Sequence, residues 1–129
     1  MSALTQKMAS MKSFRSRTPA TKEQIKRAED ELGLTFAKEY LEYLVEFGCA
    51  SFYGHEFTGI CKSARLDVVQ VTNELKKINK DIPCDWYVIE EINVDGIAVW
   101  QNSKGAVYST APNCTAQKIA NSFFDYIDL

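Results

Sequence analysis

The 129-residue sequence lacks any hydrophobic run that approaches the roughly 18 residues of a membrane-spanning helix. It also lacks a secretory signal, because the charged residues near its N-terminus are not followed by an apolar stretch. Neither G-x-G-x-x-G nor G-x-x-x-x-G-K-[ST] occurs, and this argues against a phosphate-cradling loop. We therefore expect a cytoplasmic protein that does not cross a membrane.

Residues that commonly carry metal or nucleophilic chemistry are few. The only histidine, His55, lies six residues from Cys49 and six from Cys61, whereas a zinc site needs four ligands at tight spacing. We expect no metal and no other cofactor. No C-x-x-C pair occurs, so reduced and mostly buried thiols are expected at all four cysteines: Cys49, Cys61, Cys84 and Cys114. A Cys–His nucleophile stays formally available, because such pairs are defined by geometry rather than by spacing.

Neighbouring carboxylates occur at Glu90 and Glu91, within a predicted strand. Adjacent strand residues point to opposite faces of a sheet, so these two side chains cannot act together on one group. Charged residues at the solvated edge of a sheet are the simpler interpretation.

Charge is distributed unevenly along the chain. The first 22 residues contain five basic and no acidic side chains, whereas the remaining 107 contain ten basic and 17 acidic ones. We interpret residues 1–20 as a basic leader, flexible or lightly packed, with room for one added strand or helix. Residues 21–129 then form a single acidic domain. Such a domain favours basic partners and argues against direct nucleic-acid binding through phosphates, although solubility alone would also explain the charge.

Capping residues and glycines predict two helices at the start of this domain. Thr21 and Gln24 fit a capping box, and Gly33 suits the left-handed residue that ends a helix. A second helix follows Thr35 and ends at Gly48. Its predicted core residues are Tyr40, Tyr43, Leu44 and Phe47, and its predicted solvent face carries Glu39, Glu42 and Glu46.

The rest of the chain is predicted to combine hairpins with two more helices. Aromatic residues between glycines predict a strand over 52–60, and Asp67 caps a helix that runs to Ile78. Antiparallel strands follow at 86–92, 97–101 and 106–109, with a turn through Asn93 to Gly96, and Thr115 caps a final helix over 115–127. This order predicts an α+β fold, in which an N-terminal helical hairpin and a C-terminal helix pack around an antiparallel, hairpin-built sheet.

Several short motifs have the order and residue types of one known family. Phe36-Ala37 stands where that family usually has Leu-Pro, and the other motifs match as follows: Glu29, Leu32-Gly33, Tyr40, Tyr43-Leu44, Gly48, Phe57 to Ile60, Asp95-Gly96, Gly105 to Tyr108 and Ser122 to Phe124. Together they make residues 21–127 resemble the SUKH superfamily, which includes yeast cell-wall-synthesis regulators and many bacterial toxin-immunity proteins. The matching positions are mostly apolar residues and glycines, so they indicate a fold more than an activity.

The resemblance implies a non-enzymatic domain that binds another protein. Because bacterial members typically neutralise a toxin, frequently a nuclease, we expect an immunity protein for a basic toxin domain, present as a monomer or weak dimer. The alternatives are a regulatory or scaffold domain in cell-wall or signalling control, and a small Cys/His enzyme. From the residues themselves, tyrosine anchors and carboxylates on the hairpins are the expected contact set: Tyr53, Glu56, Asp85, Tyr87, Glu90, Glu91, Asp95 and Tyr108.

Overall fold

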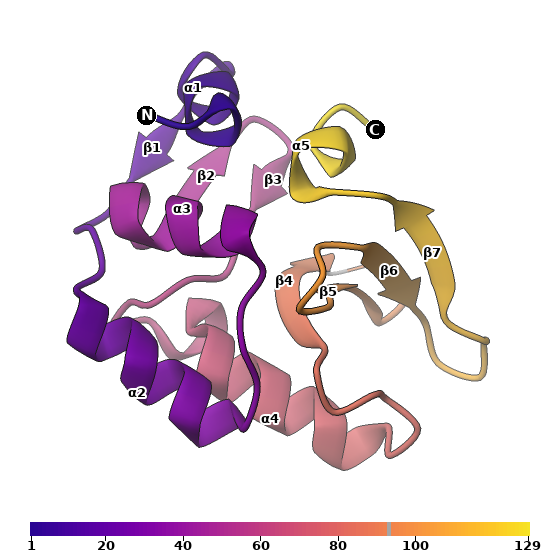
Figure 1. Cartoon of the computed structure of the whole chain (residues 1–129). Helices are drawn as coiled ribbons and strands as arrows, with labels where there is room; N and C mark the ends of the chain where they lie inside the picture. The colour runs from indigo at the N-terminus through magenta and orange to yellow at the C-terminus, as the bar shows by residue number, and fades with distance from the viewer. Residues whose placement is uncertain (93) are drawn as a thin grey trace.

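The computed structural model describes residues 1–92 and 94–129 and shows helices grouped around antiparallel strands (Figure 1). The predicted α+β class is confirmed. In chain order the elements are α1 (Ala3–Ala9), β1 (Arg15–Ser16), α2 (Lys22–Leu32), α3 (Lys38–Phe47), β2 (Ala50–Phe52), β3 (His55–Glu56), the 3-10 helix η1 (Ala64–Leu66), α4 (Val68–Ile78), β4 (Tyr87–Ile92), β5 (Ile97–Gln101), β6 (Val107–Thr110), β7 (Gln117–Ala120) and α5 (Phe123–Tyr126).

The first two predicted helices form with the predicted ends. Thr21 and Gln24 make the reciprocal capping box of α2, and Gly33 ends α2 in the left-handed conformation at φ 68°. Helix α3 begins three residues after Thr35, without a side-chain cap, and ends at Gly48. Its apolar face is buried as expected, because Tyr40, Tyr43 and Leu44 are all fully inaccessible to solvent.

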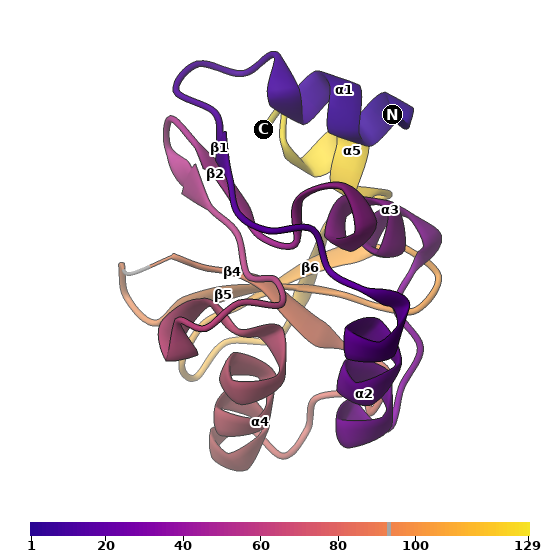
Figure 2. The same ribbon diagram turned by 90° about the vertical axis from the view of Figure 1, so that its left-hand side faces the viewer.

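The main sheet has the order β4-β5-β6-β7, and every pair of neighbours is antiparallel. Figure 2 shows this sheet crossing the middle of the molecule, with α3 and α5 on one side and α4 on the other. The face toward α3 and α5 buries Tyr87, Ile89 and Val99 in the larger core. The opposite face packs Val88 and Trp100 against α4 in a second, smaller core.

A second, three-stranded sheet has the order β1-β2-β3. The single strand predicted over 52–60 is instead a tight hairpin, because Gly54 turns the chain between β2 and β3 with φ 86°. Phe57 then forms a bridge with Glu90, and the Thr58 N–H donates to the Ile89 carbonyl. This hairpin therefore lies along the β4 edge of the main sheet.

The N-terminal segment, interpreted above as a basic leader with room for an added strand or helix, supplies α1 and β1 to the fold. Leu4 and Met8, one helical turn apart, are buried in the larger core, and Ser2 caps α1. Lys7 forms an ion pair with Asp128, which joins α1 to the C-terminal end of the chain beside it (Figure 1). This ion pair therefore links a basic residue of the N-terminal segment to the acidic remainder of the chain.

The prediction that the C-terminal helix begins at Thr115 is wrong. Residues 117–120 form β7, which pairs with β6 and places Lys118 opposite Tyr108. Only the four residues of α5 are helical, and Ser122 caps them by accepting the Asp125 N–H. Glu39 of α3 also stabilises this helix start, because its carboxylate accepts the N–H groups of Phe123 and Phe124.

Candidate protein-binding surface

The structure places Tyr87 in the core, so the prediction that it is a surface anchor is wrong. Its side chain is fully inaccessible to solvent. The Tyr87 hydroxyl donates to Gln101 Oε1 at 2.7 Å and accepts the Ala37 N–H at 3.0 Å. Burial raises the pKa of this phenol well above its ordinary value. Tyr87 is therefore a buried residue whose hydroxyl group both donates and accepts a hydrogen bond, and these bonds join the start of α3 to the sheet.

Glu90 is also internal, with only 3% of its surface exposed, and the prediction that it is a contact charge is wrong. The cause is a β-bulge: Val88 pairs with Trp100 and Glu90 with Val99, so Ile89 is an extra residue. The bulge turns both Ile89 and Glu90 toward the larger core. Glu91, opposite Ala98, points to the other face as predicted.

Three groups donate hydrogen bonds to the Glu90 carboxylate. The donors are the Glu56 N–H at 3.0 Å, the Tyr126 hydroxyl at 2.5 Å and His55 Nδ1 at 3.0 Å. The hydrogen bond to Glu90 raises the pKa of His55 above its ordinary value, although burial opposes the shift. Glu90 therefore ties β3 and α5 to the main sheet.

The same geometry places His55 and Cys49 in separate hydrogen bonds rather than in a Cys–His pair. The His55 ring is directed at Glu90, and Cys49 Sγ donates to the Phe57 carbonyl at 3.3 Å. Burial raises the pKa of Cys49 to about 12, which disfavours the reactive thiolate. Within residues 1–92 and 94–129, no group of three or more His, Cys, Asp or Glu side chains is arranged to hold a metal ion.

Four of the predicted contact residues lie on the tips and edges of two hairpins. Tyr53, at the tip of the β2–β3 hairpin, is 73% exposed. Val94, beside the β4–β5 turn, is 58% exposed. We name this surface the hairpin edge, and it comprises Tyr53, Glu56, Glu91, Ile92, Val94 and Asp95. Both hairpins project to the same side of the molecule in Figure 2.

The β4–β5 turn has the conformation expected of its Asp-Gly step. Asp95 and Gly96 both have positive φ, at 55° and 68°. Asn93, where the predicted turn begins, lies outside the described residues. Glu91 and Asp95 are both exposed beside this turn, so the hairpin edge presents two carboxylates next to apolar side chains.

The two remaining predicted contact residues lie away from the hairpin edge. Asp85, half-buried before the start of β4, accepts the Ser103 N–H at 3.4 Å. Tyr108 on β6 stacks on Trp86, with ring centroids 4.2 Å apart. The structure therefore does not gather the predicted contact residues into one patch.

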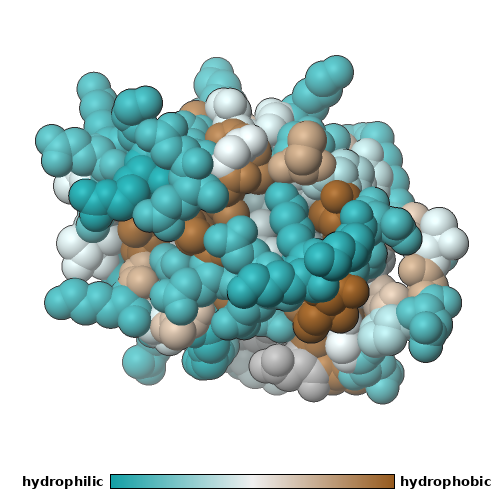
Figure 3. Space-filling model, turned by 90° about the horizontal axis from the view of Figure 1, so that it is seen from below, coloured by the Kyte–Doolittle hydropathy of each residue, from teal (hydrophilic) through white to brown (hydrophobic). Residues whose placement is uncertain are grey.

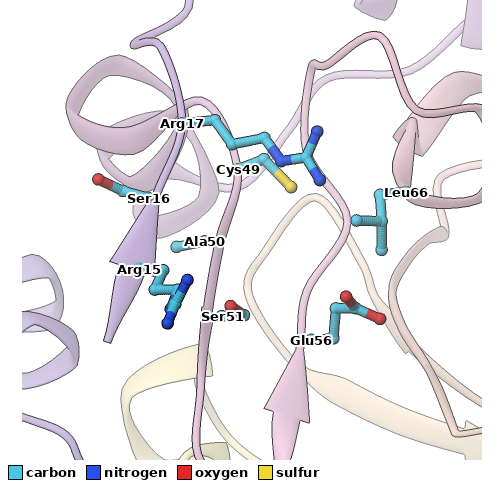
Figure 4. A pocket seen from close by; sticks show the side chains of 8 residues that line it. All are labelled: Arg15, Ser16, Arg17, Cys49, Ala50, Ser51, Glu56 and Leu66. Carbon is cyan, nitrogen blue, oxygen red and sulfur yellow. The ribbon is translucent and has the colours of Figure 1, made fainter. Parts of the chain in front are cut away.

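A pocket that the sequence did not reveal adjoins the hairpin edge (Figure 4). It has a volume of about 330 Å³ and is bounded by β1, β2, β3 and η1. Arg15, Ser51 and Glu56 are cross-strand partners, so they form one row on the outer face of the small sheet. Arg65 donates two hydrogen bonds to Glu56 and lowers the pKa of that carboxyl group.

On the side of α2 and α4, the described residues form no single broad apolar face. Figure 3, seen from that side, shows apolar atoms as separate patches among hydrophilic side chains. Among the residues that the structure describes, no helix has the length and apolar character required to cross a membrane.

The comparison with protein families supports one assignment. The family model SUKH_5, described as SMI1-KNR4 cell-wall, matches residues 2–128, which includes the N-terminal segment. A search of curated proteins finds no significant match. Domains of this family are protein-interaction domains and are generally not enzymes. With its α+β fold and a match over nearly its whole length, the chain belongs to the SUKH family of SMI1-KNR4-like domains.

Proposed function

We propose that the chain is an immunity-type protein that binds and neutralises a cognate toxin domain through the hairpin edge. The observation that carries the proposal is Tyr53, a tyrosine 73% exposed at a hairpin tip, on the same side as the exposed Glu91 and Asp95. Tyrosine is enriched at protein interfaces because it offers a large amphipathic surface with few rotatable bonds. Membership of a protein-interaction family is consistent with this use.

The carboxylates of the hairpin edge indicate the charge of the partner. Glu91 and Asp95 form no ion pair within the described residues. A basic surface opposite them would gain electrostatic complementarity, and toxins that act on nucleic acids carry basic substrate grooves. In the proposed mechanism the chain covers such a groove and excludes its substrate, so no reacting group on this chain is required.

Co-expression tests this proposal directly. The toxin domain encoded beside this chain should be harmless in cells that also produce the chain, and the two should co-purify. Replacing Tyr53 by Ala together with Glu91→Lys should abolish protection without lowering the unfolding temperature. The matched control is Glu74→Lys, an exposed carboxylate on α4, which should protect fully. Full protection by the double variant would refute the hairpin edge, and failure to bind any encoded toxin would refute the immunity role.

The family description supports a second candidate, a regulatory domain in cell-wall synthesis. That role also needs a protein partner, so binding alone does not separate the two functions. Deletion of the gene does separate them. Sensitivity to a toxin from neighbouring cells is the expected result for an immunity protein, whereas altered wall composition without any toxin would favour regulation.

A further inference from the structure

The pocket in Figure 4 is built on regular strand pairing. Arg15 pairs with Ser51, and Ser51 pairs with Glu56, so their side chains share one face of the β1-β2-β3 sheet. Arg17 follows Arg15 by two residues and therefore points to the same face. Its N–H donates to the Cys49 carbonyl at 2.9 Å, which holds this part of the chain against β2. In Figure 4 the Arg17 side chain reaches across the pocket toward Leu66.

Positive charge predominates around this pocket. Arg65 is occupied by its two hydrogen bonds to Glu56, at 2.5 and 2.9 Å. Arg15 and Arg17 have no ion-pair partner within residues 1–92 and 94–129. Two guanidinium groups thus border a concave site with their donors available, and the hydroxyl of half-exposed Ser51 lies in the same row.

Glu56, the one acidic group among these arginines, makes the pocket more suitable for a carboxylate than for a phosphate. Glu56 lines the side opposite Arg15, and although it is paired with Arg65 its carboxylate lies close to any bound anion, so it disfavours a phosphate carrying nearly two negative charges. A singly charged carboxylate is repelled less and matches the planar fork of a guanidinium group in bidentate geometry. The volume of about 330 Å³ is near the lower end of the range for ligand pockets, which suits a small group better than an extended ligand.

The pocket is continuous with the hairpin edge. Glu91 borders a small hollow together with Glu56 and Arg65, and Glu56 in turn lines the pocket. We propose that this pocket binds an aspartate or glutamate side chain of the protein that docks on the hairpin edge, with Arg15 and Arg17 as the donors. The identity of that protein rests on the proposed function, whereas the preference of the pocket for a carboxylate does not.

A titration with a small probe tests the pocket by itself. N-acetyl-aspartate amide, added to the full chain at low salt, should shift the side-chain NMR signals of Arg15 and Arg17 in a saturable manner. Arg17→Gln should weaken binding about tenfold, because one charge-assisted donor pair is removed. Arg27→Gln, an exposed arginine on α2, is the matched control and should leave the affinity unchanged.

Three results would overturn the proposal: no saturable shift at the two arginines, equal weakening by Arg27→Gln, or tighter binding of inorganic phosphate than of the carboxylate probe. Failure of the proposed function gives a different pattern. If no toxin is bound but the probe still saturates the pocket, the carboxylate site stands and the immunity role does not. Equal binding of a toxin by wild type and by Arg15→Gln/Arg17→Gln would be a fourth contrary result, because the partner would then not use the pocket.

Discussion

The sharpest stability prediction concerns Glu90, the buried carboxylate that joins β3 and α5 to the main sheet. Replacing it by Ala removes the acceptor of the Tyr126 hydroxyl, the Glu56 N–H and His55 Nδ1. Removing one member of a buried ion pair costs about 3–5 kcal/mol, because the other member is left buried without compensation. The His55 side chain retains 21% exposure, so water relieves part of this cost. We expect Glu90→Ala to lower the free energy of unfolding by about 3 kcal/mol.

The neighbouring residue provides the control. Glu91 is exposed, and its side chain forms no hydrogen bond with the described residues, so Glu91→Ala should change the free energy of unfolding by about 0.5 kcal/mol or less. Urea unfolding at pH 6, monitored by tryptophan fluorescence, measures both variants, and the slope of free energy against urea should stay constant. A loss below about 1 kcal/mol for Glu90→Ala, or equal losses for the two variants, would refute the assigned role of the carboxylate.

The same pair predicts how stability depends on pH. The hydrogen bond to Glu90 raises the pKa of His55 above its ordinary value of 6.5, so the folded protein holds this proton more tightly than the unfolded chain does. The stabilisation that the His55–Glu90 pair contributes is therefore complete below the pKa of His55 in the unfolded chain. It is lost as pH rises through the higher pKa of His55 in the folded protein. His55 is the only histidine, so no second imidazole obscures the transition. Thermal unfolding measured across this range should show the decline in wild type, and Glu90→Gln should flatten it.

Three further experiments with single substitutions test separate parts of the fold. Tyr43→Phe should cost about 2–4 kcal/mol in urea unfolding, because the buried Ala50 N–H and Thr58 carbonyl lose their partner; a loss under about 1 kcal/mol would contradict this. Gly33→Ala should lower the free energy of unfolding by about 1–2 kcal/mol, because its φ is positive but the space around it is open. Gly48→Ala should lower it more, because the new Cβ would lie 1.9 Å from a carbonyl oxygen. Equal losses for the two variants would count against that clash. Glu39→Ala should speed hydrogen exchange in α5, whereas Glu42→Ala should leave it unchanged.

Elements with strong local signals could be predicted from the sequence. The capping box at Thr21 and the left-handed glycine Gly33 define α2 through contacts within a few residues. Asp67 caps α4 in the same way, by accepting the Gln70 N–H. The strands β4, β5 and β6 lie within one residue of their predicted ranges, because alternating apolar residues and the turns between them are also local features.

Elements that depend on distant pairing could not be predicted. Strand β1 has two residues, too few for a periodic pattern, and it exists because it pairs with β2 some 35 residues later in the chain. The helical spacing of Ile119 and Phe123 predicts a helix where β7 forms, but pairing with β6 decides the conformation of this segment. The bulge at Ile89 likewise has no local marker, and it alone determines that Glu90 rather than Glu91 is buried.

These distant pairings also change what a partner protein would meet. The sequence indicates a basic leader followed by an acidic domain, and this charge distribution favours attraction of a basic partner to the whole surface of the domain. In the structure Glu90 is internal, Glu56 is paired with Arg65, and Arg15 and Arg17 border a positive pocket beside the negative β4–β5 turn. A partner must therefore match alternating charges at close range. Because a small shift of the partner would bring like charges together, this arrangement favours selectivity among related partners more than fast association with any basic protein.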